Sequence, residues 1–447
     1  MTTDLIILVP GIMGSVLKQG DVPVWNSSVF AATRTVTRFG RQMEALTLPT
    51  GLGDSAPDPT HSLNATGLIG GWHVWPGVWI GAGYHGIMTK LQEWYPEPYQ
   101  FQVFPYDWRL SNRLTAARLK SFTESALEHW RSLPNNRDAE VVFVCHSMGG
   151  LIARYYVNAL DGHQICRRII TMGTPFSGST KAVRALAGDF PKCPERLLAA
   201  MLSMPSLHQL LPSFRCVRRG HETMTLADCP IPGIASGMAA DASALHSESV
   251  DPNARTPVHA FAGRFQSTLT CVEVNGASRA YRKTWPVQKN GVWAEEDFGG
   301  DATVPSFAAT PTEWGDDTGT EYHGARHGAL PNRPRLLAAL HRKIENLAPA
   351  SFLEADFEFG LDLPDVVEAG TPVPVRVNPT DQADALNFRA SARNLKGEVE
   401  IRNMALRPDG SGGYAAELPL PAGTWHVEVA LTGQAARTTV ADLVVVW

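Results

Sequence analysis

The sequence predicts an α/β protein with a mostly parallel central sheet and an inserted cap, followed by a small all-β sandwich domain. In the first half of the 447-residue chain, short apolar runs alternate strictly with segments of helical periodicity. This order is typical of a parallel sheet with helices on both faces. After residue 352, short alternating runs are separated by Gly and Pro at the spacing expected of a β-sandwich.

Each element of the first half is predicted from its apolar pattern and from the residues that break the chain. Continuous apolar runs predict buried strands at residues 5–9, 101–104, 141–145, 168–172 and 258–263. Helical periodicity predicts helices at residues 114–130, 149–160 and 334–346. Asn332 is the expected N-cap of the last helix. A further helical piece is expected at residues 201–211, with Pro205 inside it.

The predicted domain boundaries follow from where these patterns change. An α/β domain spans residues 1–348, and the fading alternation at about 186–255 predicts a cap inserted over the sheet edge. Residues 347–350 form the expected linker. An immunoglobulin-like sandwich spans residues 352–447, although it contains no cysteine and lacks the Cys and Trp pattern of true immunoglobulin domains. Its expected strands lie at residues 372–377, 397–401, 413–418, 424–430 and 442–447.

Composition excludes several classes of function. The chain is 44% hydrophobic and 19% charged, with a formal net charge of −5, so it has no electrostatic signature of a nucleic-acid-binding protein. The N-terminus lacks the pattern of a signal peptide, and no apolar run is long enough to span a bilayer. We therefore expect a cytoplasmic protein that could be peripheral at a membrane. Its six cysteines should be reduced thiols, and their spacing matches no zinc site.

Residues 141–150 carry the strongest chemical signal. A buried strand runs through Val-Val-Phe-Val-Cys-His-Ser-Met-Gly-Gly directly into a helix. A tight turn at this place projects Ser147 above the sheet, as in the nucleophile elbow of the α/β-hydrolase fold. Cys145 occupies the position of the usual first Gly, and it is small enough for the turn. The alternative is that Ser147 only caps the helix, but the strand–turn–helix context favours a nucleophile.

A nucleophilic serine needs a base and an acid that orients the base, and in this fold they follow in the order Ser, acid, His. Asp301 lies in the Gly-rich segment 298–305, where an aspartate that only bonds its own turn is the commoner case, so the local pattern alone does not favour a triad acid. The base should lie between Asp301 and the last helix. His327 is the preferred candidate there, and His323 is the alternative.

An oxyanion hole needs two backbone N–H groups aimed at the developing negative charge. Met148, directly after the serine, supplies one of them. The Gly-containing loop at residues 10–15 follows the first strand, and the N–H of Ile12 is the candidate for the second. A plain strand-to-helix turn is the alternative explanation of this loop.

Five segments together resemble the lecithin:cholesterol acyltransferase family, which includes lysosomal phospholipase A2 and bacterial lipase-like relatives. In family order they are residues 8–15, 104–109, 144–150, 173–179 and 300–305, and the resemblance extends over about 4–346. It implies that Asp301 is the triad acid and that the residue after Pro10-Gly11 is an oxyanion donor. It also implies cleavage of phospholipid acyl esters through an acyl-enzyme, without a cofactor.

One feature of the sequence differs from the pattern of the family, and others have more than one interpretation. No cysteine precedes Cys145, so the disulfide-closed lid of secreted members is absent or held otherwise. The Gly-rich segment 67–86 is either an aromatic loop that touches lipid or covers the acyl pocket, or a packed surface. Its three tryptophans are Trp72, Trp75 and Trp79. Tyr106 is a further candidate for the pocket lining, with core packing as the alternative, and Asp107 and Arg109 are expected to form an ion pair.

Three functions remain on these observations. The first is a serine hydrolase of lipid acyl esters, of phospholipase A or lipase type, and the second is an acyltransferase that uses an alcohol acceptor. The third is an inactive binding or scaffold protein, against which an intact Ser147, Asp301 and His327 argue. The expected partners are a lipid or other acyl-ester substrate, a transient membrane contact and a protein bound through the sandwich, but no nucleic acid.

Overall fold

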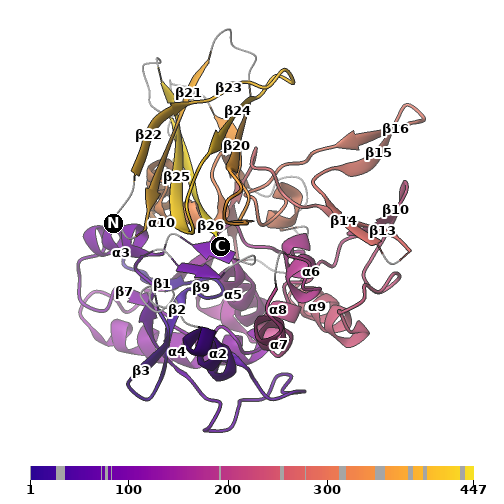
Figure 1. Ribbon diagram of the computed structural model, residues 1–447. Coiled ribbons are helices and arrows are strands. Elements are labelled where there is room, and N and C mark those ends of the chain that lie inside the picture. Colours follow the sequence, from indigo (N-terminus) through magenta and orange to yellow (C-terminus); the bar gives the residue numbers. More distant parts are fainter. Residues whose placement is uncertain are drawn as a thin grey trace.

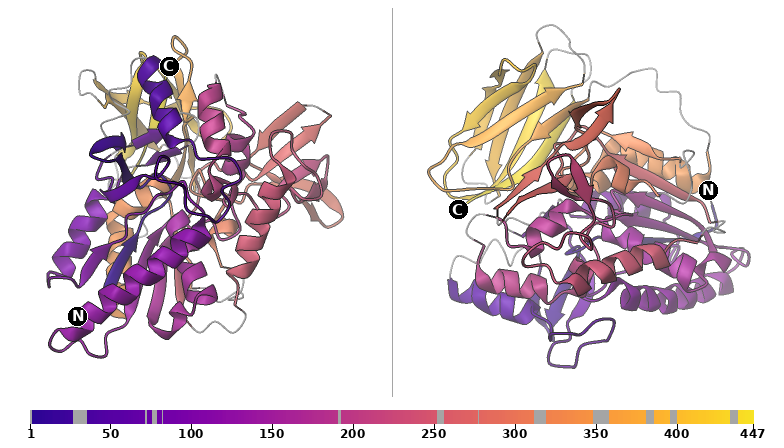
Figure 2. Two further views of the ribbon diagram at one scale, coloured as in Figure 1. Left: turned by 90° about the horizontal axis from the view of Figure 1, so that it is seen from below. Right: turned by 90° about the vertical axis from the view of Figure 1, so that its right-hand side faces the viewer.

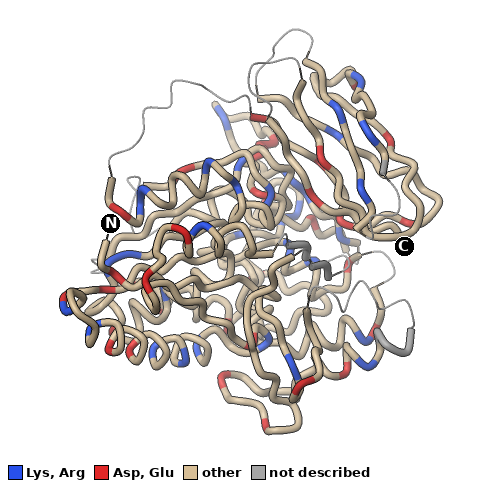
Figure 3. The backbone as a smooth tube through the Cα atoms, turned by 90° about the vertical axis from the view of Figure 1, so that its left-hand side faces the viewer, with Lys and Arg blue, Asp and Glu red and all other residues tan. Residues whose placement is uncertain are grey.

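A computed structural model gives the fold of the chain. It describes residues 2–26, 36–71, 73–75, 79–81, 83–190, 193–251, 256–276, 278–311, 319–347, 358–380, 386–395, 400–432 and 438–447. An α/β unit with an inserted cap lies against a β-sandwich built from the end of the chain (Figure 1). The predicted fold class is thereby confirmed. Lys and Arg are interspersed with Asp and Glu along the chain (Figure 3).

A six-stranded parallel sheet forms the centre of the α/β unit. Its strands are β1 (Leu5–Val9), β7 (Phe101–Val103), β8 (Val141–His146), β9 (Cys166–Met172), β12 (Val258–Gly263) and β17 (Glu321–His323). Their order is β17-β12-β9-β8-β1-β7, and every neighbouring pair is parallel. Because parallel strands end at one edge of a sheet, the loops after β1, β8, β9 and β12 meet there.

Helices cover both faces of this sheet. They are α3 (His85–Trp94), α4 (Asn112–Ser132), α5 (Met148–Ala159) and α10 (Pro334–Glu345). Side chains alternate along β1, so Ile7 shares a hydrophobic core with α4 and α5, whereas Ile6 shares another with α3 and α10. Burial on both faces explains why the strands are continuous apolar runs. The five strands and three helices predicted here have bounds within two residues of the observed ones, whereas β17 and α3 were not predicted.

Two local predictions are wrong. Asn332 does not cap α10, because its amide instead donates to the Gly83 carbonyl and accepts from the Ile87 N–H. Arg333 occupies the cap position without a capping side-chain bond. Residues 201–211 do not form one helix, because Pro205 lacks the N–H that a helix interior needs and begins a helix of its own.

The predicted cap region lies between β9 and β12. Helix α6 (Thr180–Leu186) leads into it and ends at its predicted start, and the region contains α7 (Glu195–Leu202), α8 (Pro205–His208), β10 (Val217–Arg219), β11 (Glu222–Met224) and α9 (Ser236–Glu248). A segment after β12 joins it through β13 (Cys271–Asn275), which pairs with β10, and β14 (Ser278–Arg282). The hairpin of β15 (Trp285–Lys289) and β16 (Val292–Glu296) extends away from the body (Figure 1). The predicted end of the cap at residue 255 lies outside the described residues.

The N-terminal region adds small sheets beside the main one. It contains β2 (Ser15–Gln19), β3 (Val22–Trp25), α2 (Val36–Leu46) and β4 (Asn64–Leu68). In the Trp-rich segment, β5 (His73–Trp75) and β6 (Trp79–Gly81) form a hairpin in which Trp75 pairs with Trp79. Trp72 lies outside the described residues, as do the side chains of Trp75 and Trp79, so the lid or lipid-contact role stays a prediction. Over the described part of the chain, no helix is long and apolar enough to cross a membrane.

Two sheets make up the C-terminal sandwich (Figure 2). One contains β18 (Phe359–Asp362), β20 (Val373–Pro379), β24 (Tyr414–Leu418) and β23 (Arg407–Pro408). The other contains β19 (Val366–Val367), β26 (Thr439–Val446), β25 (Gly423–Thr432), β21 (Asn387–Asn394) and β22 (Glu400–Ala405). Alternate residues point inward, so that Val375 of the first sheet shares a core with Phe388 and Trp425 of the second. The predicted linker beyond residue 347 lies outside the described residues.

Candidate active site

Ser147 stands at the turn between β8 and α5 in a strained backbone conformation. Its φ of 52° and ψ of −128° are unusual for a residue with a side chain. Its N–H donates to the Met172 carbonyl, and its own carbonyl accepts from the Thr174 hydroxyl and the Gly150 N–H. The side chain makes no capping bond to α5. These backbone bonds hold the turn, so that the hydroxyl is directed away from the helix.

The hydroxyl of Ser147 meets His327, which in turn meets Asp301. The Ser147 Oγ lies 2.8 Å from His327 Nε2, and His327 Nδ1 lies 2.7 Å from Asp301 Oδ2. A carboxylate can only accept, so Nδ1 is the donor to Asp301 and Nε2 accepts from the serine hydroxyl. All three residues are buried, although 154 and 26 positions separate them along the chain. The structure therefore brings the three triad candidates into one hydrogen-bonded line.

Backbone bonds fix the Asp301–His327 pair from both sides. The Asp301 Oδ1 atom accepts from the N–H groups of Thr303 and Val304 at 2.9 and 2.7 Å. The N–H of His327 donates to the Asp301 carbonyl at 2.7 Å. Asp301 thus does bond its own turn, as the alternative interpretation expects, while its second carboxylate oxygen remains directed at the imidazole.

His323, the other candidate base, is placed elsewhere. It ends the edge strand β17, and its ring packs edge-on against Phe261 with centroids 5.5 Å apart. Burial lowers the pKa of His323. No hydrogen bond to Ser147 or Asp301 is found among its described contacts, so the geometry favours His327.

The two candidate oxyanion donors lie beside Ser147. A Cβ placed on Gly11 would come within 2.7 Å of the Ser147 Cβ, so the loop after β1 passes directly against the nucleophile candidate. Within the described part of the chain, the N–H groups of Ile12 and Met148 meet no hydrogen-bond acceptor. Two buried donors kept open beside a serine are the arrangement that an oxyanion hole requires.

Sequence reasoning missed Tyr84 and His146, which connect the parts of the site. The Tyr84 hydroxyl accepts from the Gly11 N–H and contacts His146 Nδ1, both at 2.8 Å. Burial raises the pKa of Tyr84, so it remains a hydroxyl and donates to Nδ1. His146 Nε2 then donates to the His327 carbonyl at 3.1 Å. His146 adjoins the serine and could have been singled out, whereas no local pattern marks Tyr84.

Tyr106, Asp107 and Arg109 lie beneath this loop. Tyr106 is buried and donates its hydroxyl to the Pro10 carbonyl at 2.7 Å, so that a pocket-lining role stays a prediction. The expected ion pair between Asp107 and Arg109 is present, with contacts of 2.9 and 2.6 Å to the two carboxylate oxygens. Arg109 also donates to the carbonyls of Ala45, Leu46 and His61. The pair therefore connects the segment after β7 to the end of α2 and to the loop before β4.

The remaining chemistry-bearing groups are dispersed. All six cysteines are free, and all but Cys193 are buried. Burial raises the pKa of the Cys145 thiol well above its usual range, which leaves it an unreactive neighbour of the elbow. Among the described residues, no group of three or more His, Cys, Asp or Glu is placed to hold a metal ion.

The strand order, the strand–turn–helix at Ser147 and the inserted cap define an α/β-hydrolase fold. The family model of lecithin:cholesterol acyltransferase matches residues 79–212, a segment that contains Tyr106 and Ser147. The resemblance predicted from the motifs is confirmed over this segment, which is similar to the lecithin:cholesterol acyltransferase family.

The chain was also compared with solved structures and curated proteins. The mature form of the lipase BlEst2 from Bacillus licheniformis is 11% identical, with a TM-score of 0.34 over 76% of this chain and 91% of that chain. The propeptide form of the same lipase is 10% identical, with a TM-score of 0.31 over 99% and 94%. No curated protein sequence matches the chain significantly.

Proposed function

We propose that the protein is a serine hydrolase that cleaves acyl esters of lipids through an acyl-enzyme on Ser147. The observation that carries the proposal is the hydrogen-bonded line from Ser147 Oγ through His327 to Asp301. The match to the lecithin:cholesterol acyltransferase family supports a lipid acyl ester as the substrate class. Contact with a bilayer would then be transient, as the enzyme collects its substrate.

In the proposed mechanism, Ser147 Oγ attacks the ester carbonyl carbon while its proton passes to His327 Nε2. Asp301 holds the imidazole in the tautomer that can accept this proton and stabilises the resulting imidazolium. The carbonyl oxygen becomes an oxyanion and accepts from the N–H groups of Ile12 and Met148. The C–O bond then breaks as the imidazolium gives its proton to the leaving alkoxide, and the acyl group stays on Ser147.

A second half-reaction releases the acyl group. Water gives a proton to His327 Nε2, its oxygen attacks the acyl carbon, and a fatty acid leaves as Ser147 recovers its proton. An alcohol in the place of water would yield a new ester, so the acyltransferase alternative uses the same residues. Whether water or an alcohol reaches the acyl-enzyme decides between hydrolysis and acyl transfer.

Lipid profiling tests the proposal. Vesicles of mixed phospholipid and neutral glyceride are incubated with the wild type, Ser147→Ala and the control Ser177→Ala, whose serine lies outside the hydrogen-bonded line. We expect free fatty acid from the wild type and the control, and a loss of about 10⁴-fold or more for Ser147→Ala. Lysophospholipid would identify a phospholipase A, and a newly acylated alcohol a transferase. Equal turnover by Ser147→Ala would refute the proposal.

Fluorophosphonate labelling separates an enzyme from an inactive scaffold, because the probe reacts only with an activated serine. We expect the wild type to be labelled at Ser147, and His327→Ala to label far more slowly. An unlabelled wild type that folds normally would favour the scaffold alternative.

A further inference from the structure

We propose that the C-terminal sandwich is a structural part of the active site, because it positions Asp301 and His327 through two buried polar side chains, Gln266 and Arg326. The inference rests on the proposed function of these two residues. It gives the sandwich a role in turnover that is separate from any partner it binds.

Arg326 connects the sandwich to the candidate base. It directly precedes His327, and its side chain is 6% exposed. Its guanidinium pairs with the carboxylate of Asp442 on β26 and donates to the carbonyl of Leu361 on β18 at 3.0 Å. A buried cation is stable only while it is paired and hydrogen-bonded. The sandwich therefore fixes the backbone that carries His327.

Gln266 connects the sandwich to the candidate acid. The side-chain amide of Gln266 is fully buried. It donates to the Phe359 carbonyl at 3.3 Å and accepts from the Leu361 N–H at 3.0 Å, so it bonds the backbone of β18 in the way that a neighbouring strand would. The backbone N–H of Gln266 donates to the Gly300 carbonyl at 3.1 Å, and Gln266 forms a parallel bridge with Asp301. One residue thus joins β18 to the turn that holds the acid.

The sandwich backbone approaches this loop closely. A Cβ placed on Gly360, between the two bonds of Gln266, would lie 2.1 Å from the Phe265 carbonyl oxygen. No side chain fits there without a shift of β18 away from the loop. The backbone of β18 therefore contacts the backbone of this loop directly, so that a displacement of β18 would also displace the loop.

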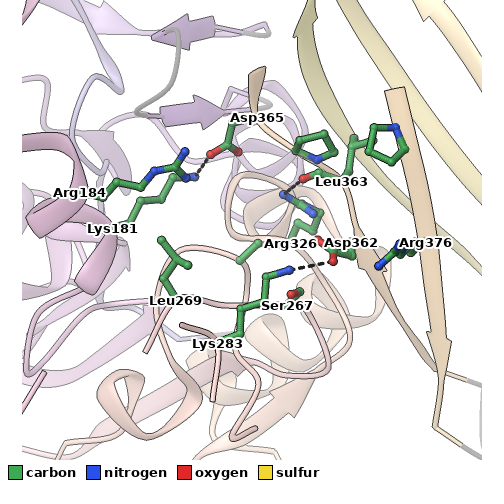
Figure 4. A pocket seen from close by; sticks show the side chains of 13 residues that line it. Lys181, Arg184, Ser267, Leu269, Lys283, Arg326, Asp362, Leu363, Asp365 and Arg376 are labelled. Carbon is green, nitrogen blue, oxygen red and sulfur yellow. Dashed lines mark hydrogen bonds and ion pairs between the residues drawn. The ribbon is translucent and has the colours of Figure 1, made fainter. Parts of the chain in front are cut away.

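Charge pairs surround the junction and supply a matched control. A cavity of about 410 Å³ lies there, and its lining includes Ala302 and Arg326, which adjoin the acid and the base (Figure 4). Across it, Asp365 pairs with Lys181 at 3.0 Å and Asp362 with Lys283 at 2.8 Å. The Asp362 pair joins the same two units as the Asp442 pair, but it does not include Arg326.

The test compares Asp442→Asn with Asp362→Asn in the full-length protein, using kcat, KM and the melting temperature. Asparagine keeps the shape of the side chain but removes the charge that holds Arg326. We expect kcat of Asp442→Asn to fall about tenfold, with KM within about twofold of the wild type. Asp362→Asn should keep kcat within about twofold of the wild type.

A double-mutant cycle tests whether Asp442 affects kcat through Arg326. If Asp442 acts through Arg326, adding Asp442→Asn to Arg326→Gln changes kcat by less than about twofold. Independent, multiplying losses would overturn the inference, as would equal kcat for Asp442→Asn and Asp362→Asn. If Asp442→Asn does not fold, Gln266→Met is measured in the same way, and wild-type kcat in that variant overturns the inference. Fluorophosphonate labelling of the wild type but not of Ser147→Ala shows that the proposed function stands even where the inference fails.

Discussion

Three serines occupy the N-cap position of a described helix, and only Ser147 does not use its hydroxyl to cap the helix. Ser111 and Ser179 accept from the N–H groups of Arg113 and Lys181 and cap α4 and α6. Ser147 makes no such bond, because its positive φ turns the side chain away from the helix. Such a backbone conformation costs about 1–3 kcal/mol. The surrounding backbone bonds stabilise the turn, and the hydroxyl meets His327 instead.

Gly173 lies directly against the Asp301–His327 pair. Its φ is +61°, and an added Cβ would lie 2.8 Å from Asp301 Oδ2 and 3.0 Å from His327 Nδ1. We expect Gly173→Ala to displace the pair and to lower kcat by about 10²-fold, since displacements of about 1 Å have this effect. Gly220→Ala is the matched control, because Gly220 has a φ of +60° with nothing within 4 Å. Similar kcat values in the two variants would contradict the prediction.

Tyr84→Phe should loosen the connection between the loop at residues 10–15 and His327. The change removes the only oxygen that accepts from the Gly11 N–H in the described structure, and a buried unsatisfied donor costs about 1–3 kcal/mol. We expect a lower melting temperature and a fall in kcat of about tenfold. Tyr95→Phe is the control, since its hydroxyl bonds Glu345, which also accepts from the Thr2 N–H near the start of β1, at the edge of the sheet opposite the site. A fall in stability alone, equal in both variants, would show that Tyr84 is only structural.

At the scale of elements, the parallel sheet brings distant loops together. Ser147 follows β8, Gly173 follows β9, and Gln266 lies in the loop after β12. Their meeting at one edge follows from strand direction, and the sequence predicts it. The cap is harder to predict, because β13 joins it through a pairing with β10 that crosses 54 residues.

Acid should weaken the cap through His246 on α9. Burial, together with the charge of Arg154, lowers the pKa of His246 to about 4, whereas an unfolded histidine titrates near 6.5. Between about pH 6.5 and 4 the unfolded chain therefore binds a proton that the folded chain does not, so stability falls as pH falls. Melting temperatures between pH 7 and 4.5 should drop less for His246→Gln than for the wild type.

The control for this prediction is His129→Gln, which changes an exposed histidine on α4. It should reproduce the wild-type dependence on pH. His259, whose pKa burial also lowers to about 4, remains in both variants and keeps some dependence in each. Parallel curves for His246→Gln and the wild type would show that His246 does not contribute.

At the scale of the whole molecule, the buried charge pair at the junction should matter more for stability than the exposed one. The side chains of Lys181 and Asp365 are 8% and 15% exposed, against 42% and 33% for Lys283 and Asp362. Burial opposes ionisation of Asp365, but Lys181 and Arg326 lower its pKa below the ordinary value. Asp365→Asn leaves Lys181 buried without its partner.

Calorimetry of Asp365→Asn and Asp362→Asn checks this expectation. Loss of one partner of a buried pair destabilises by about 3–5 kcal/mol, whereas exposed pairs contribute about 0–1 kcal/mol. We expect a clear drop in the melting temperature for Asp365→Asn and almost none for Asp362→Asn. Equal shifts of the melting temperature in the two variants would contradict the prediction and would mean that water screens both ion pairs equally.

The sequence by itself predicts the elements with strong local patterns. Doubly buried strands and amphipathic helices follow from apolar periodicity, and the elbow at Ser147 follows from a strand that runs straight into a helix. Strands such as β18 and β19 escape this reasoning because they are too short to show a period. The amide of Asn332 fits a capping pattern, but tertiary bonds to Gly83 and Ile87 occupy it.

The sequence by itself determines the fold class and predicts Ser147 as the nucleophile and the order of the triad candidates, because these depend on local patterns and strand direction. The sequence already favours His327 over His323, but the hydrogen bonds that support this preference are visible only in the tertiary structure. The same holds for the Tyr84–His146 connection and the contact of the sandwich with Arg326. Each depends on groups far apart in the chain that meet within 3.1 Å or pair after folding. Such contacts arise from packing, which no local pattern records.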